Sequence, residues 1–333
     1  MIMSEINWKL GQCEHLESPW GNAGGVVKTV DDVERMARTG VGWIEAGSYT
    51  LEKRYGNNRD PKTGEFTIDP DTGQPIEVYH HDPNTGKTYN SLGMPQKGMD
   101  TVEAEIPEMA EIAHAHNKKL IVNVAPVTSD PASESQELVR RSYEAGADAV
   151  LLNGGCPNVW DKDGERHEIL STNAQASGQV LNKLRPIAEK FKPVFYRISP
   201  PPSYSSLKAI LRGVESSGAV SAVFVPNSFR VPIPCKKGKK VLGIKGETAG
   251  MTGPATTKDT YKLAKWAKEI LKSSNIDIVR SGGIADWEAG GVRAGDELRR
   301  TLALGVLAAG TTFYYESEDW QEDTHKLLSS LSI

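Results

Sequence analysis

Eight short apolar runs recur along the chain, and amphipathic segments separate most of them. The runs occupy residues 24–27, 42–47, 120–125, 148–153, 194–198, 222–228, 276–283 and 311–315. Short apolar runs bounded by glycine, proline or asparagine are typical of buried parallel strands, whereas segments such as 29–36 and 133–145 have the apolar spacing of covering helices. Eight strand-helix units predict a closed (β/α)8 TIM barrel rather than an open sheet.

The chain of 333 residues is long enough for one large core, and we expect a single domain over residues 1–333. Residues 56–89 interrupt the alternation, because they repeat an Asp-Pro-x-Thr-Gly turn motif at 60–64, 69–73 and 82–86. Such turns favour chain reversals. We expect residues 65–68 and 76–79 to form the arms of a β-hairpin insertion near the C-terminal face of the barrel. The alternative is a surface decoration without a functional role.

The charge of the chain limits the class of partner. The formal net charge is −4, whereas proteins that bind nucleic acids or anionic membranes usually carry a basic excess. We therefore expect a small-molecule ligand, with no nucleic acid and no membrane as partner. The sequence opens without a basic and then apolar leader, and no run of 18 apolar residues occurs. We expect a cytoplasmic protein.

The cysteines and histidines do not have the spacing of a metal centre. Cys13, Cys156 and Cys235 are odd in number and far apart, which favours free thiols in a reducing compartment. The charged groups at 77–81 and 161–167 also lack a ligand spacing tied to one helix face or strand pair. We interpret them as solvated loop residues and expect no metal site.

The most informative stretch is 148–158, where an apolar strand runs directly into a Gly-Gly-Cys-Pro-Asn loop. Asn153 and Asn158 place amides on both sides of Cys156. A single thiol between two amides at the end of a strand suits a catalytic acid or base, and this is the reading we favour. The alternative is a small buried thiol in a turn.

Other polar signals also fall at strand ends, on the face where barrel enzymes carry their active sites. Asn90 is expected in a loop after the second strand, and Asn227 and Ser228 end the sixth. Arg197 needs an anionic partner there, which a flavin's pyrimidine edge or a structural salt bridge could supply. The segment 281–283 is a candidate phosphate cradle or a simple turn, and 246–254 a second wall of the same site.

Five of these motifs, in one order, resemble the dihydroorotate dehydrogenase family, with the closest likeness to its soluble class 1A. They are residues 48–57, 90–95, 153–158, 227–228 and 281–283, and the resemblance runs from about Pro19 along nearly the whole chain. It implies an FMN-bound flavoprotein, an oxidoreductase that converts dihydroorotate to orotate in pyrimidine biosynthesis. It also implies a homodimer, with fumarate as a possible electron acceptor or NAD through a partner subunit.

The resemblance assigns roles to single residues. Cys156 would be the base that removes the C5 proton, while flavin N5 accepts the C6 hydride. The substrate-binding residues would be Asn90, Leu92, Gly93, Met94, Asn153, Asn158, Asn227 and Ser228. The cofactor-binding residues would be Ala23, Gly24, Gly25, Ser48, Asn123, Arg197, Gly250, Ser281, Gly282, Gly283 and Ser317.

The chain departs from the family pattern at four places. Gly47 and Arg197 each stand where the family has a lysine. Residues 154–155 are glycines where the family has Leu-Ser. At the usual phosphate contact, Glu316 precedes Ser317. Two alternatives remain. The Gly-Cys-Pro loop is similar to that of the tRNA dihydrouridine synthases, which are also FMN barrels, and a barrel that binds a ligand without dehydrogenase activity is the other.

Overall fold

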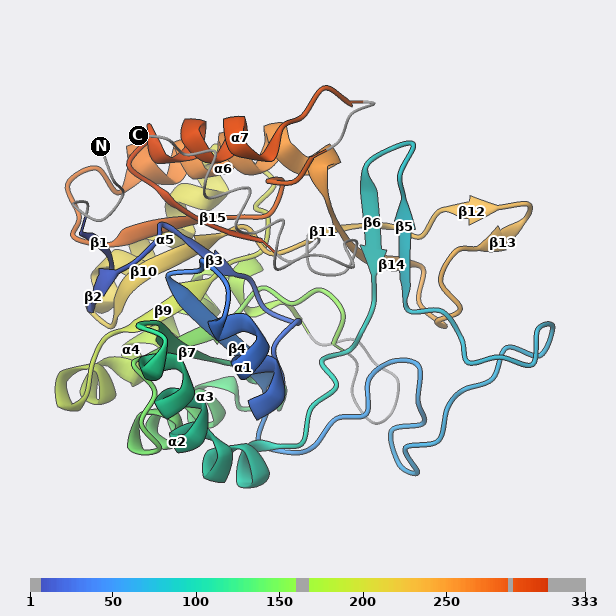
Figure 1. The fold of residues 1–333 in the computed structure, drawn as a ribbon, viewed down its shortest axis with the longest axis horizontal. Coiled ribbons are helices and arrows are strands. Elements are labelled where there is room, and N and C mark those ends of the chain that lie inside the picture. Colours follow the sequence, from blue (N-terminus) through green and yellow to red (C-terminus); the bar gives the residue numbers. More distant parts are fainter. Residues whose placement is uncertain (1–6, 160–167, 287–289, 311–333) are drawn as a thin grey trace.

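The computed structural model describes residues 7–159, 168–286 and 290–310. Eight parallel strands close into a barrel in chain order, so the predicted (β/α)8 architecture is confirmed (Figure 1). The barrel strands are β3 (Trp20–Asn22), β4 (Trp43–Tyr49), β7 (Lys119–Val124), β8 (Ala149–Asn153), β9 (Val194–Arg197), β10 (Val220–Val225), β15 (Asp277–Ser281) and β16 (Leu307–Gly310).

Helices cover the outside of the barrel. They are α1 (Val30–Ala37), α2 (Met99–Ala115), α3 (Pro131–Glu144), α4 (Ala174–Lys190), α5 (Tyr204–Ser217), α6 (Thr257–Ile270) and α7 (Ala294–Leu302). Several begin at a side-chain cap that satisfies a free backbone N–H group. Thr29 and Asp32 form a capping box at α1, and Asn173 and Ser203 cap α4 and α5. The described part of the chain has no helix long and apolar enough to cross a membrane.

Two apolar cores fix the barrel. One lies between the strands and the covering helices, and the other fills the barrel interior with side chains such as Trp43, Phe195 and Phe224. The hairpin of β1 (Trp8–Leu10) and β2 (Cys13–Leu16) belongs to the interior core. Its turn donates from the Gly11 N–H to Asp277, the first residue of β15, over 2.7 Å. The hairpin therefore closes the N-terminal end of the barrel and leaves the other end for the site.

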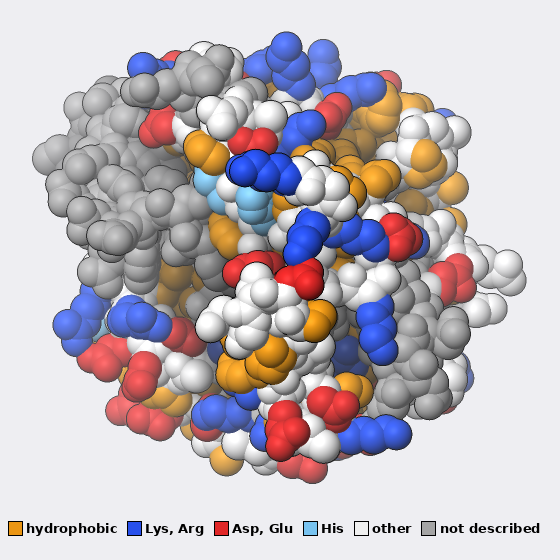
Figure 2. All heavy atoms as spheres, turned by 90° about the vertical axis from the view of Figure 1, so that its right-hand side faces the viewer, with side chains coloured by type: hydrophobic (Ala, Val, Ile, Leu, Met, Phe, Trp, Pro, Cys, Tyr) orange, Lys and Arg blue, Asp and Glu red, His pale blue; other side chains and the backbone are white. Residues whose placement is uncertain are grey.

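A second sheet stands at the C-terminal end of the barrel. It contains β5 (Tyr79–Asp82), β6 (Lys87–Asn90), β11 (Phe229–Pro232) and β14 (Thr248–Thr252), in the order β11-β14-β6-β5, and we call it the mouth sheet (Figure 1, right). The small ladder of β12 (Cys235–Lys236) and β13 (Lys239–Lys240) extends beyond it. Figure 2 shows the face that carries this sheet, where acidic and basic side chains are intermixed in the visible described part.

The mouth sheet differs from the predicted hairpin in position. Its tight turn uses only the third Asp-Pro-x-Thr-Gly motif, between β5 and β6, while residues 65–68 and 76–79 are not strands except for Tyr79. The earlier segment forms only isolated bridges, Arg59 with Phe66 and Ile68 with Pro75. Asn90 is the last residue of β6 rather than part of a loop. The partner strands β11 and β14 come from the connection after β10, which short-range patterns cannot pair with residues 79–90.

The first and last barrel strands also differ from the prediction. The first strand is Trp20–Asn22, and residues 24–27 lie beyond it with a single bridge between Val27 and Ala46. The last described strand is Leu307–Gly310, which lies just before the expected strand 311–315, and residues 311–315 lie outside the described residues. Leu-Ala-Ala-Gly is short and rich in helix-forming alanine, and Trp-Gly-Asn has the composition of a turn. Barrel closure overrides both preferences.

Candidate active site

A cavity of about 220 Å³ lies at the C-terminal end of the barrel. Its wall contains Cys156 and all of the residues predicted to bind substrate, together with the predicted cofactor residues Gly24, Gly25, Ser48 and Arg197. Three further lining residues, Lys28, Pro95 and Pro157, were not predicted to bind either ligand. Strand ends separated by long stretches of sequence therefore meet around one thiol.

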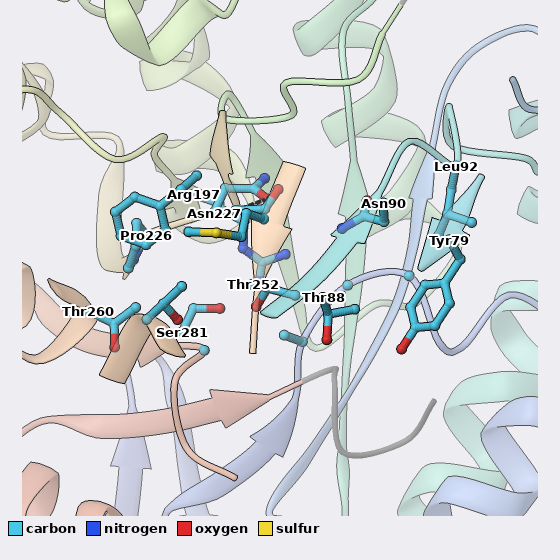
Figure 3. Close-up of a pocket in the computed structure, with 18 residues that line it drawn as sticks. Tyr79, Thr88, Asn90, Leu92, Arg197, Pro226, Asn227, Thr252, Thr260 and Ser281 are labelled. Atoms are coloured by element: carbon cyan, nitrogen blue, oxygen red, sulfur yellow. Dashed lines mark hydrogen bonds between the residues drawn. The ribbon is translucent and has the colours of Figure 1, made fainter. Parts of the chain in front are cut away.

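A second cavity, of about 110 Å³, adjoins the first under the mouth sheet. We call the first the larger cavity and the second the smaller cavity. Figure 3 shows Arg197, Asn227 and Ser281 from the barrel strands and their loops, with Thr88 and Asn90 of β6 across from them. The predicted cofactor residues in its wall are Ala23, Gly24, Gly25, Arg197, Ser281 and Gly282. The two cavities adjoin along a common wall, and we call them together the hollow; the shared residues are Gly24, Gly25, Asn90, Leu92, Arg197, Asn227 and Ser228.

The Cys156 loop passes very close to β9 because two glycines precede the thiol. A Cβ on Gly155 would lie 2.7 Å from the backbone nitrogen of Ser199, and one on Gly154 would lie 2.5 Å from the Tyr196 hydroxyl. The Ser199 hydroxyl also donates to the Gly155 carbonyl over 2.9 Å. A larger pair of residues at these positions would push the loop, and with it the half-buried Cys156, further into the cavity.

A chain of side-chain amides surrounds the thiol and has a fixed orientation. The Asn153 amide oxygen accepts from Asn227 Nδ2 over 3.0 Å and from the Gly155 N–H over 3.2 Å. Its nitrogen donates to Ser48 Oγ over 2.9 Å. The Ser228 N–H in turn donates to Asn227 Oδ1 over 2.7 Å. Because each amide is held by two or more partners, the cavity presents its donors and acceptors in one arrangement.

Asn158 connects the cysteine loop to the mouth sheet. Its Nδ2 donates to the carbonyl of Asn90 over 2.9 Å and to the Asn90 side-chain oxygen over 3.1 Å. Asn57 reaches the same loop, with its Nδ2 donating to the Asn158 carbonyl over 3.1 Å. The Asn158 amide oxygen is buried and has no hydrogen-bond partner among the described residues. It is therefore an acceptor available to a ligand.

Arg197 has an anionic partner within the chain. Both Glu45 oxygens accept from its guanidinium nitrogens at 2.6 Å, and both side chains are almost fully buried. The Asn123 Nδ2 also donates to Glu45, over 2.5 Å. The salt-bridge alternative for Arg197 is thus the one the structure contains. Two buried polar atoms of this cluster, Arg197 Nε and Asn123 Oδ1, lack a hydrogen-bond partner in the described part of the chain.

Lys28 brings a second cation to the larger cavity. It precedes α1, and its ammonium donates to the Ser48 carbonyl over 3.5 Å. Burial lowers the pKa of this lysine to about 8, while the negative charges of Cys156, Glu45 and Asp32 oppose that decrease. The ammonium remains largely protonated at pH 7.

The glycine loop after β15 is supported from below by Arg280. The guanidinium of this fully buried arginine donates to Thr257 O and Thr260 Oγ1 and pairs with Glu297 over 2.9 Å. Gly282 and Gly283 have φ angles of +83° and +72°, a region that favours glycine. Gly282 lines the smaller cavity and presents its backbone there.

Some predicted cofactor residues do not line either cavity. Asn123 points to Glu45, Gly250 of β14 packs against Ser228 and Asn158, and Gly283 faces Thr257 and Thr260. Gly250 and Gly283 each lie against a lining residue, and Asn123 binds the acid that pairs with the lining residue Arg197. Ser317 and Glu316 lie outside the described residues, as do the charges at 161–167. Within the ranges that the structure describes, no group of three or more potential ligands could hold a metal ion.

Sequence reasoning missed several residues that shape the hollow. Glu45 is a lone acid within an apolar strand, which is a signal for a buried cationic partner. Lys28 lies just beyond the two glycines, between the predicted strand at 24–27 and the predicted helix at 29–36, and was assigned no role. The threonines of the smaller cavity, Thr252, Thr256 and Thr260, carry no distinctive pattern and meet only through the fold.

The two other thiols are placed differently from Cys156. Cys13 is buried in the barrel interior, and this burial raises the pKa of its thiol to about 12. Cys235 is exposed in β12. A third cavity, of about 270 Å³, shares Met94, Asn153 and Cys156 with the first, so Cys156 borders two hollows.

A comparison of the chain with known protein families identifies the family to which it belongs. A model of the dihydroorotate dehydrogenase family matches residues 12–331, nearly the whole chain. The chain belongs to the dihydroorotate dehydrogenase family. The barrel, the cysteine loop and the amide-lined hollow are therefore features of a member of this family.

Individual relatives are distant in sequence. The chain is 22% identical over 282 residues to the mitochondrial quinone dihydroorotate dehydrogenase of Lachancea kluyveri, covering 82% of this chain and 62% of that protein. It is 24% identical to a dihydroorotate dehydrogenase of Dictyostelium discoideum, covering 60% of this chain and 54% of that protein. It is 25% identical to the catalytic subunit of the dihydroorotate dehydrogenase B (NAD(+)) of Lachnoclostridium phytofermentans, covering 69% of this chain and 69% of that protein. The chain thus spans less than two thirds of the length of the first two relatives.

The position of Gly47 explains one departure from the family pattern. Gly47 has a φ of +128°, and a Cβ there would overlap the carbonyl oxygen of Asn123 in β7. A lysine cannot occupy this position without moving β4 or β7. The described cations that line the larger cavity come instead from Lys28 and Arg197.

Proposed function

We propose that the protein is an FMN-dependent dihydroorotate dehydrogenase that oxidises dihydroorotate to orotate in pyrimidine biosynthesis. The observation that carries the proposal is the hollow at the end of the barrel, in which one thiol faces a set of oriented amides in a member of this family. Amides with fixed donors and acceptors match the alternating N–H and C=O groups of a dihydropyrimidine ring.

The residues present fit a bound FMN. Arg197 lines both cavities, and its buried Nε is a donor without a hydrogen-bond partner among the described residues, which matches the polar edge of a flavin. Gly24 lies over the Glu45–Arg197 pair, where a Cβ would come within 2.7 Å of Glu45 Oε1, so a side chain at this position would disturb the pair. Ser281 and Gly282 would hold the phosphate.

Cys156 would act on the substrate as a base. Its thiolate takes the proton from C5 as the C5–C6 bond becomes a double bond. When bound, FMN supplies the acceptor for the hydride that leaves C6. Asn90, Asn153 and Asn158 hold the ring so that C5 faces the sulfur, and the backbone amides of 92–94 bind the carboxylate.

The test is anaerobic reduction of the purified yellow protein by dihydroorotate, followed by its visible spectrum. Wild type is expected to bleach, and Cys156→Ser is expected to bleach at least about 100-fold more slowly. The serine hydroxyl is a much weaker acid than the thiol, so the anion that would remove the C5 proton forms far less readily. Cys235→Ser is the matched control and should bleach as wild type does. A flavoprotein that is indifferent to dihydroorotate would refute the substrate, and other pyrimidines and tRNA would be tried next.

The enzyme class, the electron acceptor and the oligomeric state are part of the same proposal. We propose a class 1A enzyme that works in the cytoplasm as a homodimer and passes electrons to fumarate, in line with the sequence motifs and the cysteine base. Two of the relatives above are named for quinone and for NAD(+), so the assay compares fumarate, a soluble quinone and NAD(+) as oxidants of the reduced protein. Reoxidation by fumarate is expected, and sedimentation tests the dimer.

We also propose that residues 1–333 act as one domain and that the 56–89 insertion covers the site. Tyr79 and Thr88 line the smaller cavity, which supports a role in enclosing the cofactor. Replacing Tyr79 by alanine is expected to accelerate FMN release. An unchanged release rate would favour a surface decoration.

A further inference from the structure

The charge of the larger cavity comes from one side chain. Among the described residues that line it, only Lys28 and Arg197 carry a formal charge at neutral pH. Arg197 is neutralised by Glu45 through two hydrogen bonds of 2.6 Å. The ammonium of Lys28 forms no ion pair within the described residues, and its one hydrogen bond there is to a neutral carbonyl. It therefore supplies the net positive charge of this cavity.

Lys28 is held by hydrogen bonds both at its backbone and at its ammonium group. Its backbone N–H donates to Asp32 Oδ2 over 2.9 Å, and its carbonyl accepts from the Tyr49 hydroxyl over 3.2 Å. The ammonium donates to the carbonyl of Ser48, whose hydroxyl accepts from Asn153 at the start of the cysteine loop. The lysine is thus tied to the same short network that positions the Cys156 loop.

The charged groups around Lys28 and Cys156 can be named from each packed element. The negative charges that act on Lys28 are those of Cys156, Glu45 of β4 and Asp32 of α1, and Cys156 lines the same cavity. Asp32 accepts from the capping N–H groups and pairs with Arg35, and Glu45 pairs with Arg197. The remaining anionic partner for the ammonium is a Cys156 thiolate.

The charge of Cys156 also acts on a second cation, Arg54. Its Nε donates to the Gly93 carbonyl over 3.1 Å, and it lies near Glu134, which accepts from the N–H groups of Val127 and Thr128. Glu134 is thus engaged by backbone groups, as the two acids near Lys28 are engaged by their own partners. Lys28 lines the same cavity as Cys156, whereas Arg54 is not among the lining residues of that cavity. Lys28 is the cation whose removal should change the thiol most.

We propose that Lys28 is a positioning residue that keeps Cys156 ionised, so that a thiolate and not a thiol meets the substrate. This inference rests on the proposed role of Cys156 as base. A thiolate is the form that can remove a proton, and an adjacent cation favours that form over the neutral thiol. Lys28 supplies this charge from the segment before α1, since Gly47 has no room for a side chain.

The experiment measures the ionisation of Cys156 directly, without substrate. The purified holoprotein is alkylated with iodoacetamide between pH 5 and 10, and mass spectrometry follows the Cys156 peptide. In Lys28→Met and Lys28→Gln, the midpoint of the rate profile is expected to move to higher pH, and the rate at pH 7 to fall about tenfold or more. Lys28→Arg keeps the charge and should remain close to wild type.

Two internal controls make the readout specific. The exposed Cys235 is alkylated in the same sample, and its profile should not respond to Lys28. Lys208→Met repeats the substitution at an exposed lysine of α5 and should leave the Cys156 profile unchanged. Lys28→Gln can still donate to the Ser48 carbonyl, so a folded variant is available if Lys28→Met does not fold.

Identical Cys156 profiles in wild type and the neutral Lys28 variants would overturn the inference, even if the enzyme oxidises dihydroorotate. A Lys28-dependent profile in a protein that ignores dihydroorotate would support the inference and refute the proposed substrate. The two failures are therefore distinguishable.

Discussion

At the scale of single residues, Glu45 and Arg197 form a buried ion pair beside both cavities. Burying two ions is costly, and their mutual attraction offsets that cost only while both are present. The pair also leaves Arg197 Nε directed elsewhere, because the two terminal nitrogens hold Glu45. A lysine at this position could not bind Glu45 through two nitrogens and retain a further donor.

Removing one partner of this pair should therefore be severe. Glu45→Gln leaves Arg197 buried without its anion, and we expect a loss of about 3–5 kcal/mol in the free energy of unfolding, measured by urea denaturation. The control is Glu247→Gln, which removes the acid of an ion pair with Lys240 in which Glu247 is 80% exposed, and should change stability little. Equal losses in the two variants would contradict the special role of the buried pair.

Single residues also show what the sequence could and could not predict of the site. Cys156, Asn153 and Asn227 were predictable, because polar residues at the ends of apolar strands converge in a barrel. Lys28 was not, because its role depends on the backbone geometry at Gly47 and on the Ser48 carbonyl. Neither is visible as a motif.

At the scale of elements, the barrel strands follow from the sequence wherever they are long and apolar. Trp43–Tyr49 and Val220–Val225 are examples, since local preference and burial agree there. Trp20–Asn22 and Leu307–Gly310 are short, and their pairing with each other around the closed barrel fixes them. The mouth sheet likewise depends on pairing between distant segments, which periodicity does not reveal.

The pairing of β14 with β6 makes a prediction about Gly250. A Cβ at this position would lie 2.5 Å from Ser228 Oγ and 3.0 Å from Asn158 Nδ2. Gly250→Ala should displace both side chains and lower kcat/KM for dihydroorotate about tenfold or more, with little change in the fold by circular dichroism. The matched control is Gly178→Ala in α4, which meets no atom within 4 Å and should increase stability by about 0.5–1 kcal/mol. Unchanged kinetics in Gly250→Ala would argue against a tight site at this strand.

At the scale of the whole molecule, stability and chemistry are placed at opposite ends of the barrel. The β1–β2 hairpin closes the N-terminal end with Leu10, Cys13 and Leu16, while both cavities open at the other end. Changes at the closed end should therefore affect folding without affecting the site.

Leu10 offers the cleanest test of this separation. It is fully buried in the interior core, so Leu10→Ala should cost about 2–5 kcal/mol in the free energy of unfolding through lost contacts and a cavity. The KM of the Leu10→Ala variant for dihydroorotate should stay within about twofold of the wild-type value. A large change in KM, measured well below the unfolding transition, would mean that the two ends are coupled.

The mouth sheet also bears on the order in which the protein can assemble. The hydrogen bond from Asn90 Nδ2 to the Gly250 carbonyl joins residues 160 positions apart, so β6 must wait for β14 and the six barrel strands made before it. Contacts of such long sequence separation form late, since their loop must close first. A growing chain on the ribosome would therefore hold six of its eight barrel strands before the mouth sheet can form, and the rate of flavin uptake during refolding would report when the hollow is complete.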